Sequence, residues 1–394
     1  MVNPLKYSCL FGGGAIRGLA YVGTIRALEE LGIEYDIIAG SSVGAIIASL
    51  VACGYKSYEI ENFFMKVKFD LFKDIHLGFG DGFALSKGGI FQNWLNELLS
   101  SKFDKITDRV VNFGDIEKKL IIITTDIKNF KPVEFSTYKT PEFSVAQAIK
   151  ISSSMPGLMA PYEYNNSYLV DGDLQKASPM WKLSPYFDNS EGRILEFRLE
   201  GDYSKDEKNP ISFINTIYSC VTEVASDFVS EIYGKNDKYD CISINTGSVF
   251  FADFNLSKDE RRKLIELGYE QTMNYFKKVL PAKKEALTSV YLQILTSCKK
   301  LLKGLKSKNV EEVEWWFGKI FTVLCENKEI IDPKIYAKII ETRDLITNNT
   351  ATLLFFYQSF KNLKELIKAV EEAILILDER VTDLKLYLQI VDEN

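Results

Sequence analysis

The feature that most limits the fold of this chain is an uncharged stretch from Ile37 to Tyr55 with Gly-Ser-Ser-Val-Gly near its start. Its length would suffice for a helix across a bilayer. A bilayer span must be a continuous helix, however, and the glycine pair interrupts this one directly after the strand-like "YDIIA". We therefore expect a buried strand over Tyr35–Ala39, a sharp bend, and a buried helix to Cys53, with Gly54 as its stop.

The bend itself reads G-x-S-x-G from Gly40 to Gly44, with Ser42 at its centre. This pattern is typical of a nucleophilic serine on a tight strand-to-helix turn. The glycines relieve backbone crowding, and the amino end of the following helix favours negative charge at the serine. The alternative is a buried turn of small residues without a chemical role.

A second glycine-rich turn, "GGGAIRG" (Gly12 to Gly18), follows a predicted strand over Lys6–Phe11. A run of glycine N–H groups beside Arg17 suits an acyl oxyanion or a lipid phosphate. It is not a P-loop, because no Gly-Lys-Ser/Thr follows, and Arg17 breaks the pattern G-x-G-x-x-G. A tight turn without a ligand is the alternative.

The chain has one histidine, His76, in a segment that reads as a loop. A metal site with two histidine ligands cannot be built within one chain, and a Ser-His-Asp triad could use only His76. We therefore expect a carboxylate as the base for a serine nucleophile. Asp171 in "LVDGD" stands at a predicted strand end and is the candidate. An aspartate in this position is otherwise a turn-former or a helix cap.

Composition excludes several classes of protein. The net charge of -6 argues against a general nucleic-acid binder. Six scattered cysteines without a CxxC pair predict a reducing compartment and neither a disulfide framework nor a zinc site. The amino-terminal sequence lacks the pattern of a secretory signal peptide. We expect a cytoplasmic protein, peripheral at membranes, or one exported as an effector without a cleaved signal peptide.

Strand and helix patterns alternate through the first part of the chain and predict an α/β fold with helices on both faces of the sheet. The expected strands are Lys6–Phe11, Tyr35–Ala39, Lys119–Ile127, Arg193–Glu200 and Tyr239–Gly247, with a hairpin over Tyr162–Asp173. Helices are expected from about Arg17 to Leu31 and over Ser144–Gly157.

Strand signals stop after Pro281, so we expect a catalytic domain over 1–280 and a helical domain over 281–394. The expected helices are Ala282–Leu302, Val310–Cys325, Pro333–Thr347 and Thr350 to the end. The last one carries an apolar heptad from Leu353 to Val391. It either packs in an antiparallel bundle or forms a coiled-coil seam with a partner protein or a second copy.

Four motifs in order resemble the patatin-like phospholipase family over about residues 6–276. They are "GGGAIRGLAYVGTIRALEELGI", "GSSVGA", "SSSMPGLMAPY" and "LVDGD". The resemblance implies a three-layer sandwich with a mostly parallel central sheet. The C-terminal helical region is not matched.

The resemblance also implies a Ser-Asp dyad, with Ser42 as nucleophile and Asp171 as base. It implies acyl-ester hydrolysis of phospholipids or lysophospholipids, without a metal or organic cofactor. The remaining site residues implied by position are the oxyanion loop Gly12, Gly13, Gly14, Ala15 and Arg17, the elbow glycines Gly40 and Gly44, and the motif neighbours Gly172 and Asp173. Gly13 and Gly14 are the oxyanion donors that the resemblance favours most.

Two residues depart from the family pattern. Ala15 replaces the third glycine of G-G-G-x-R-G, and its N–H remains usable if its dihedrals are negative. Asp173 replaces the small residue after Asp-Gly. A second carboxylate near Asp171 would raise the pKa of Asp171. If the Asp173 side chain points to solvent, this effect is small; if it points inward, activity would need a cation or a partner.

Two segments could contact lipid. The aromatic segment Phe63–Leu85 forms either an interfacial lid or ordinary helix packing. Lys277–Lys308 holds nine lysines against one acidic residue, and it forms either a basic surface for anionic lipid or a solvated helix face.

The sequence thus favours a lipid acyl hydrolase of the phospholipase A or lysophospholipase type. One alternative is an esterase or thioesterase for soluble substrates. Another is a catalytically weak or partner-activated protein that binds a protein partner or membrane through its C-terminal helices, alone or as a homo-oligomer.

Overall fold

The computed structural model describes residues 6–69, 86–103, 110–175, 193–201, 239–249, 253–347 and 360–393, with parts of 216–224. The described chain divides into two compact units, and the division falls between Met273 and Asn274. The first unit holds a sheet and its helices, and the second holds helices alone.

The sheet of the first unit has eight strands within the described residues. They are β1 (Lys6–Phe11), β2 (Glu34–Gly40), β3 (Lys119–Asp126), β4 (Lys131–Ser136), β5 (Tyr162–Tyr164), β6 (Ser167–Asp171), β7 (Arg193–Glu200) and β8 (Tyr239–Asn245). The order is β5-β6-β3-β2-β1-β7-β8, and β4 pairs with β3. The pairs β8–β7, β7–β1, β1–β2 and β2–β3 are parallel. The pairs β3–β4, β3–β6 and β6–β5 are antiparallel.

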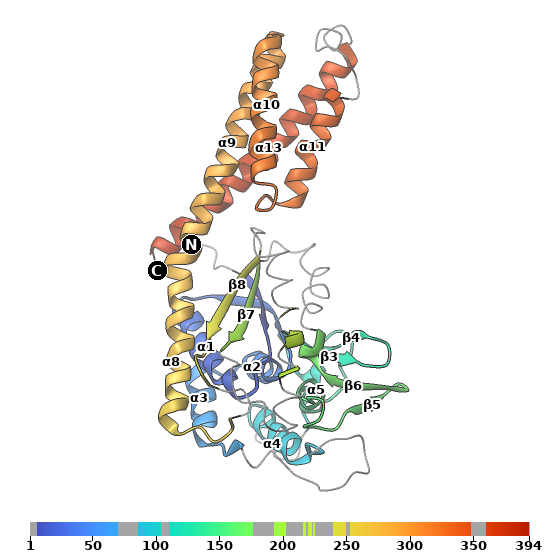
Figure 1. The fold of residues 1–394 in the computed structure, drawn as a ribbon, viewed down its shortest axis with the longest axis vertical. Helices are drawn as coiled ribbons and strands as arrows, with labels where there is room; N and C mark the ends of the chain where they lie inside the picture. The colour runs from blue at the N-terminus through green and yellow to red at the C-terminus, as the bar shows by residue number, and fades with distance from the viewer. Residues whose placement is uncertain are drawn as a thin grey trace. The chain divides into compact units, whose positions relative to one another are not determined.

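This arrangement confirms the predicted α/β class with a mostly parallel sheet (Figure 1). The predicted hairpin is β5–β6, and its turn residues Asn165 and Asn166 have φ of 49° and 60°, as a tight two-residue turn requires. Strand β4 was not expected. It begins Lys131-Pro132, and proline is disfavoured in strands except at an edge such as this one.

The helices of this unit have the following bounds: η1 (Ala15–Leu19), α1 (Ala20–Glu30), α2 (Val43–Ala52), α3 (Ser57–Lys66), α4 (Gly89–Ser100), η3 (Phe113–Asp115), α5 (Val145–Ser152), η4 (Gly172–Gln175) and α8 (Lys258–Asn274). Helix α2 packs on β1, β2 and β3, and α5 packs on β3 and β6.

Both faces of the sheet are covered, as the neighbours Leu10 and Phe11 on β1 show. Both are buried, although adjacent strand residues point to opposite faces. The ring of Phe11 lies 5.3 Å from that of Tyr21 on α1, while Leu10 belongs to a cluster with residues such as Ile37 and Ile121. The active-site candidates therefore lie at or just beyond the ends of strands whose two faces are both buried.

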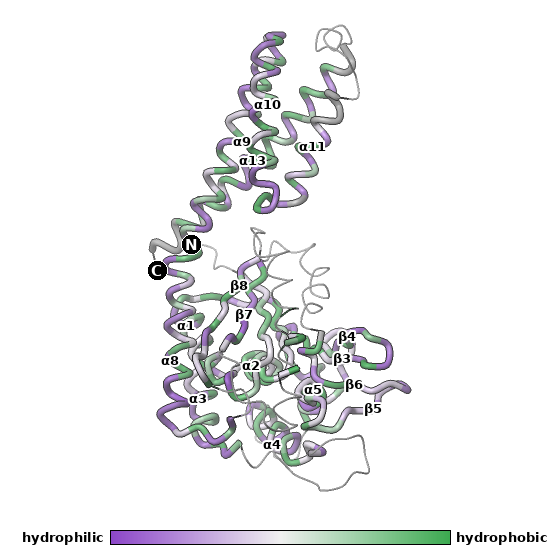
Figure 2. The backbone as a smooth tube through the Cα atoms, in the orientation of Figure 1, coloured by the Kyte–Doolittle hydropathy of each residue, from purple (hydrophilic) through white to green (hydrophobic). Residues whose placement is uncertain are grey.

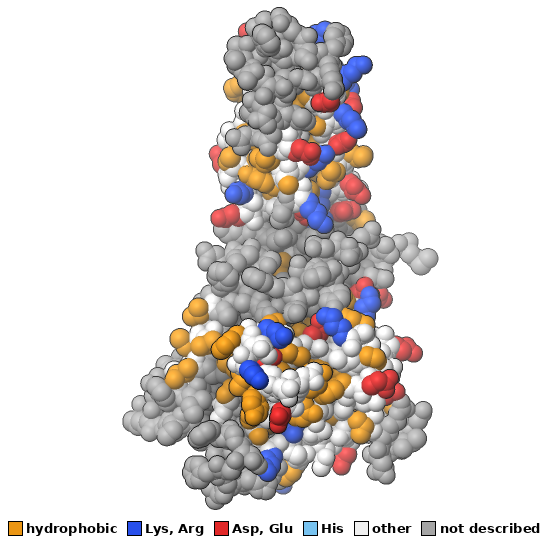
Figure 3. Space-filling view, turned by 90° about the vertical axis from the view of Figure 1, so that its right-hand side faces the viewer, with side chains coloured by type: hydrophobic (Ala, Val, Ile, Leu, Met, Phe, Trp, Pro, Cys, Tyr) orange, Lys and Arg blue, Asp and Glu red, His pale blue; other side chains and the backbone are white. Residues whose placement is uncertain are grey.

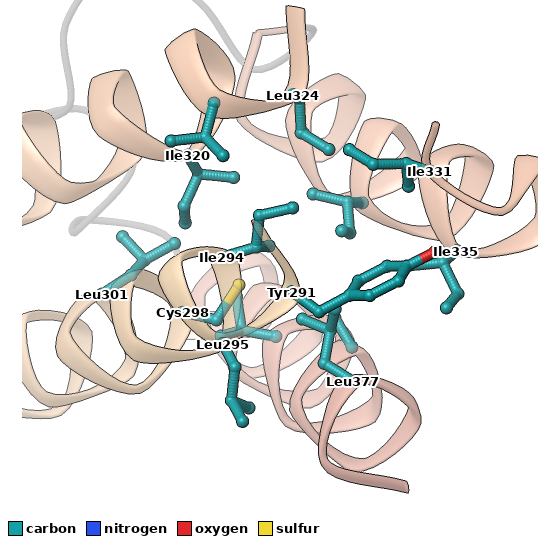
Figure 4. Close-up of a cluster of buried hydrophobic side chains, with 14 of the residues drawn as sticks. Tyr291, Ile294, Leu295, Cys298, Leu301, Ile320, Leu324, Ile331, Ile335 and Leu377 are labelled. Carbon is teal, nitrogen blue, oxygen red and sulfur yellow. The ribbon is translucent and has the colours of Figure 1, made fainter. Parts of the chain in front are cut away.

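The second unit consists of η5 (Tyr275–Val279), α9 (Leu280–Ser307), α10 (Val310–Glu326), α11 (Pro333–Thr347) and α13 (Phe360–Glu393). Hydrophobic and hydrophilic residues alternate along these helices (Figure 2). Figure 4 shows part of the core, where Tyr291 and Ile294 of α9 meet Ile320 of α10 and Leu377 of α13. None of the described helices is long and apolar enough to cross a membrane.

The described positions of the C-terminal heptad face this core. Leu363, Val370, Leu377, Val381 and Leu384 are all buried among residues of the same unit. These contacts favour the bundle over the coiled-coil seam for this part of the helix. The first heptad positions, Leu353 and Phe356, and the last, Val391, lie outside the described side chains.

Candidate active site

The register of β3 brings two strand ends together. Strand β4 pairs with β3 from Ile121 to Asp126, so β2 and β6 must share the opposite edge. Strand β2 ends with Gly40 opposite Ile122, and β6 ends with Asp171 opposite Thr124. Because β2 and β6 run in opposite directions, their carboxyl ends meet end to end on β3. The residues that follow each strand are thereby neighbours.

The bend after β2 has the strained backbone that the motif predicts. Ser42 has φ 51° and ψ -126°, directly before α2 begins at Val43. The flanking glycines are required by close backbone contacts. A Cβ on Gly40 would lie 2.3 Å from the carbonyl oxygen of Gly44, and one on Gly44 would lie 2.0 Å from that of Phe11. The predicted strand, bend and helix are therefore present, with Ser42 at the bend.

Ser42 and Asp171 form a hydrogen-bonded pair. The Ser42 hydroxyl donates to Asp171 Oδ2 at 2.8 Å, and both residues are buried. The other carboxylate oxygen, Oδ1, accepts the backbone N–H of Asp173 at 2.9 Å. The backbone N–H of Asp171 in turn donates to the carbonyl of Ser154 at 3.0 Å. The carboxylate is thus fixed with one oxygen toward the serine, the arrangement of a nucleophile and its base.

Ser152, at the end of α5, supports the bend from a third element. Its hydroxyl accepts the N–H of Ser42 at 2.9 Å and donates to the carbonyl of Ile123 at 2.6 Å. Ile123 is the β3 residue between the two strand ends. Ser152 was not singled out from the sequence, although it lies in the quoted segment "SSSMPGLMAPY".

The backbone N–H groups of the expected oxyanion loop differ in their hydrogen-bond acceptors. Gly12 N–H donates to the Phe197 carbonyl at 3.0 Å and so continues the pairing of β1 with β7. Gly13 N–H donates to Asp173 Oδ1 at 3.0 Å. In the described part of the chain, no acceptor is present for the N–H of Gly14. Of the two favoured oxyanion donors, Gly13 and Gly14, the N–H of Gly13 therefore already donates to the Asp173 carboxylate.

The backbone of this loop is left-handed at two successive positions. Gly14 has φ 149°, and a Cβ there would lie 2.7 Å from the side chain of Leu199. Ala15 has φ 48°, so the negative dihedral expected for a usable Ala15 is not found. Arg17 is buried, with Nε 3.5 Å from the Gly14 carbonyl oxygen. The Arg17 side chain therefore contacts the backbone of the loop at Gly14.

Tyr21 holds the same loop from α1. Its hydroxyl is 2.9 Å from the carbonyl oxygen of Gly12 and 3.0 Å from that of Phe197. Burial raises the pKa of Tyr21 well above its ordinary value, and the charges of Asp173 and Glu196 raise it further. The phenol therefore stays protonated and remains a donor to the loop.

Asp173 points inward, one of the two orientations considered from the sequence. Its side chain is buried and accepts the hydroxyl of Ser41 as well as the N–H of Gly13. Gly172 before it has no room for a side chain, because a Cβ would lie 2.2 Å from the Ile123 carbonyl oxygen. The segment Asp171–Asp173 thus packs tightly against both β3 and the bend.

No group of three His, Cys, Asp or Glu side chains in the described residues could hold a metal ion. The aromatic segment Phe63–Leu85, for which a lid and ordinary helix packing were the two alternatives, lies largely outside the described residues, including Phe79 and His76. Its first part is packed. Phe64 is buried, and the ring of Phe63 lies 5.5 Å from that of Tyr55.

Residues 10–181 match the family model of patatin-like phospholipases. The protein contains a patatin-like phospholipase domain. The matched region includes the glycine loop, the bend at Ser42 and the Asp171–Asp173 segment. The recognition of this family from the sequence is confirmed for residues 10–181.

The individual relatives have low sequence identity to this chain. The uncharacterized protein YqhO of Bacillus subtilis is 27% identical over 292 residues, which are 68% of this chain and 97% of YqhO. A cGAMP-activated phospholipase of Vibrio cholerae is 26% identical over 202 residues, 45% of this chain and 56% of that protein. The crystal structure of VipD from Legionella pneumophila superposes with a TM-score of 0.48 and 16% identity, covering 98% of this chain and 91% of VipD.

Proposed function

We propose that this patatin-like domain hydrolyses carboxylic ester bonds of membrane phospholipids or lysophospholipids through an acyl-Ser42 intermediate. The observation that carries the proposal is the 2.8 Å hydrogen bond from the Ser42 hydroxyl to the buried Asp171 carboxylate. The pair lies at a strained strand-to-helix bend close to a helix amino end, which is where a nucleophilic serine is typically placed.

The chemistry follows from this pair. Asp171 Oδ2 takes the hydroxyl proton as Ser42 Oγ attacks the ester carbonyl, and a tetrahedral oxyanion forms. The C–O bond to the alcohol then breaks, and Asp171 returns the proton to the leaving alcohol. A water molecule attacks the acyl-serine with Asp171 again as base. The C–Oγ bond breaks, the fatty acid leaves, and Ser42 regains its proton.

The proposal is tested by fatty-acid release from mixed phospholipid vesicles. We expect Ser42→Ala and Asp171→Asn each to lower the rate by about 10³-fold or more, because either change removes the nucleophile or its base. Asp259→Asn is the matched control, since Asp259 is an exposed residue in the first turn of α8. Its rate should equal that of the wild type.

The competing functions give different results in the same assay. Hydrolysis of soluble esters or thioesters without release from vesicles would identify a soluble esterase. No hydrolysis of any ester by the folded protein would leave a fold that serves binding through its C-terminal helices. A hydrolysis rate that does not depend on Ser42 would exclude the acyl-Ser42 mechanism.

We also propose that the protein meets lipid at a surface that we call the hairpin patch, made of Ile127, Phe130, Tyr168, Lys128 and Lys131. The three apolar side chains are 42%, 83% and 49% exposed, in that order. Figure 3 looks at the side on which the β3–β4 and β5–β6 hairpins project in Figure 1, and it shows hydrophobic side chains beside basic ones there. Exposed apolar groups next to lysines suit an anionic lipid interface.

Hydrogen bonds between the β3–β4 and β5–β6 hairpins hold the residues of the hairpin patch next to one another. Lys128 Nζ donates to the Asn166 carbonyl at 2.7 Å, and Ile127 N–H donates to the Tyr168 carbonyl at 3.1 Å. By contrast, the basic surface expected within Lys277–Lys308 is partly neutralised. Lys299 pairs with Asp378, and Lys306 pairs with Glu371.

The hairpin patch is tested by co-sedimentation with anionic vesicles. Replacing Phe130 and Tyr168 by Ser should weaken binding at least about tenfold, since each buried aromatic side chain contributes roughly 1.5–3 kcal/mol. Tyr58→Ser is the control, because Tyr58 is 71% exposed on α3. Equal loss with Tyr58→Ser, or no loss with the double variant, would rule out a specific patch.

A further inference from the structure

The carboxylate of Asp173 holds a hydrogen-bond donor that the proposed reaction needs. Asp173 Oδ1 accepts the N–H of Gly13 at 3.0 Å and the hydroxyl of Ser41. The side chain is only 4% exposed, so these contacts take place away from bulk water. Gly13 is a favoured oxyanion donor by its place in the motif.

The space next to the Cα atom of Gly13 also adjoins the proposed nucleophile, Ser42. A Cβ built on Gly13 would lie 2.9 Å from Ser42 Cβ and 2.1 Å from Asp173 Oδ2. The carboxylate and the serine therefore converge on one small volume. A negative oxyanion that develops there would lose the Gly13 donor and would be repelled by a buried negative charge.

We infer that Asp173 is an internal occupant of the oxyanion site, and that its side chain must leave Gly13 before Ser42 can react efficiently. The inference rests on the proposed function and deepens it. The occupied site is the resting state of the protein, and hydrolysis begins when the ester carbonyl displaces the carboxylate from the Gly13 N–H.

The backbone and the side chain of Asp173 have separate roles. The backbone N–H donates to Asp171 Oδ1 at 2.9 Å and positions the base. The side chain instead bonds to Gly13 and Ser41. A substitution of the side chain can therefore free the oxyanion donor while the base keeps its backbone hydrogen bond.

Asp173→Ala and Asp173→Gly test this inference, because neither replacement has a side-chain oxygen that could accept the Gly13 N–H. The substrate is a soluble chromogenic ester, for which no membrane is required. We expect kcat to rise at least about tenfold in both variants, with a smaller change in KM, because one oxyanion donor is typically worth about 10²–10³ in kcat. Ser41→Ala removes one of the two hydrogen bonds that hold the carboxylate and should give a smaller rise. Adding Ser42→Ala to Asp173→Gly should abolish the gain.

Labelling of Ser42 by a fluorophosphonate provides a second readout and separates the two proposals. Faster labelling of both Asp173 variants than of wild type supports the internal occupant. Equal or slower labelling and turnover, in variants whose thermal unfolding is unchanged, overturns it even where wild-type hydrolysis depends on Ser42. If Ser42 stays unlabelled in all variants and hydrolysis does not depend on it, the proposed function fails as well.

Discussion

At the residue scale, the site is built from side chains whose direction is fixed by local backbone. The positive φ of Ser42 turns its hydroxyl toward Asp171, and glycines such as Gly40, Gly44 and Gly172 have no space for a Cβ. Such strained positions persist only where the surrounding structure holds them, and they concentrate at functional sites.

Ala15 is a second strained position and gives a direct prediction. Its φ of 48° is unfavourable for a residue with a Cβ, by about 1 kcal/mol or more. Ala15→Gly should therefore raise the free energy of unfolding by up to about 1 kcal/mol, after the greater flexibility of glycine in the unfolded chain is subtracted. Urea denaturation measures the change. A clear loss of stability would show that the methyl group contributes more by packing than it costs in backbone strain.

At the element scale, the meeting of β2 and β6 on β3 depends on the turn after β3. Asp126 accepts hydrogen bonds from the hydroxyl of Ser167, from the backbone N–H groups of Lys128 and Asn129, and from the Asn129 side chain. These bonds connect the end of β3 to the start of β6. They stabilise the register between β3 and β6, which places Asp171 next to Ser42.

This cluster predicts a specific acid sensitivity. Burial by itself raises the pKa of Asp126, but the hydrogen bonds outweigh it and lower the pKa to about 2. Because the pKa is depressed in the folded state, the stabilisation is fully present above about pH 4 and is lost as pH falls toward 2. Asp126→Asn should lower the free energy of unfolding by roughly 1–3 kcal/mol at pH 7. The deficit should shrink between pH 4 and 2, and a constant deficit would contradict this origin.

Helix packing in the first unit gives another prediction. A Cβ on Gly23 of α1 would lie 1.8 Å from the Ile265 carbonyl oxygen on α8, and one on Gly268 would lie 1.9 Å from that of Ala20. Gly23→Ala should therefore destabilise the protein by roughly 1–3 kcal/mol through overpacking. Gly318→Ala is the matched control in α10, where no atom lies within 4 Å of the added Cβ. Helix propensity alone should make it stabilising by about 1 kcal/mol, and equal losses in both would exclude overpacking.

At the scale of the whole molecule, the described residues form a sheet unit with the candidate site and a helical unit with its own core. Periodic apolar patterns, with a glycine, proline or polar cluster at their ends, predicted β1, β3 and the helices of the second unit, because such patterns are local. The same locality explains the prediction of Ser42 and Asp171, each at the end of a strand pattern.

What the sequence did not predict depends on contacts between distant segments. Ser152 supports the bend only because α5 ends beside Ile123, and no local pattern encodes that contact. The inward direction of Asp173 is set in the short turn after β6, where strand alternation no longer applies. Its hydrogen bond with Gly13 joins residues 160 positions apart.

The most direct test of the central claim is to find the acyl group on Ser42. Wild-type protein would be mixed with vesicles whose phospholipid carries a radiolabelled acyl chain, quenched during turnover, digested and mapped by peptide. The expected result is label on the peptide that contains Ser42, sensitive to hydroxylamine and absent in Ser42→Ala. Fatty-acid release by the wild type with no label on that peptide, and with full release by Ser42→Ala, would contradict the acyl-Ser42 mechanism.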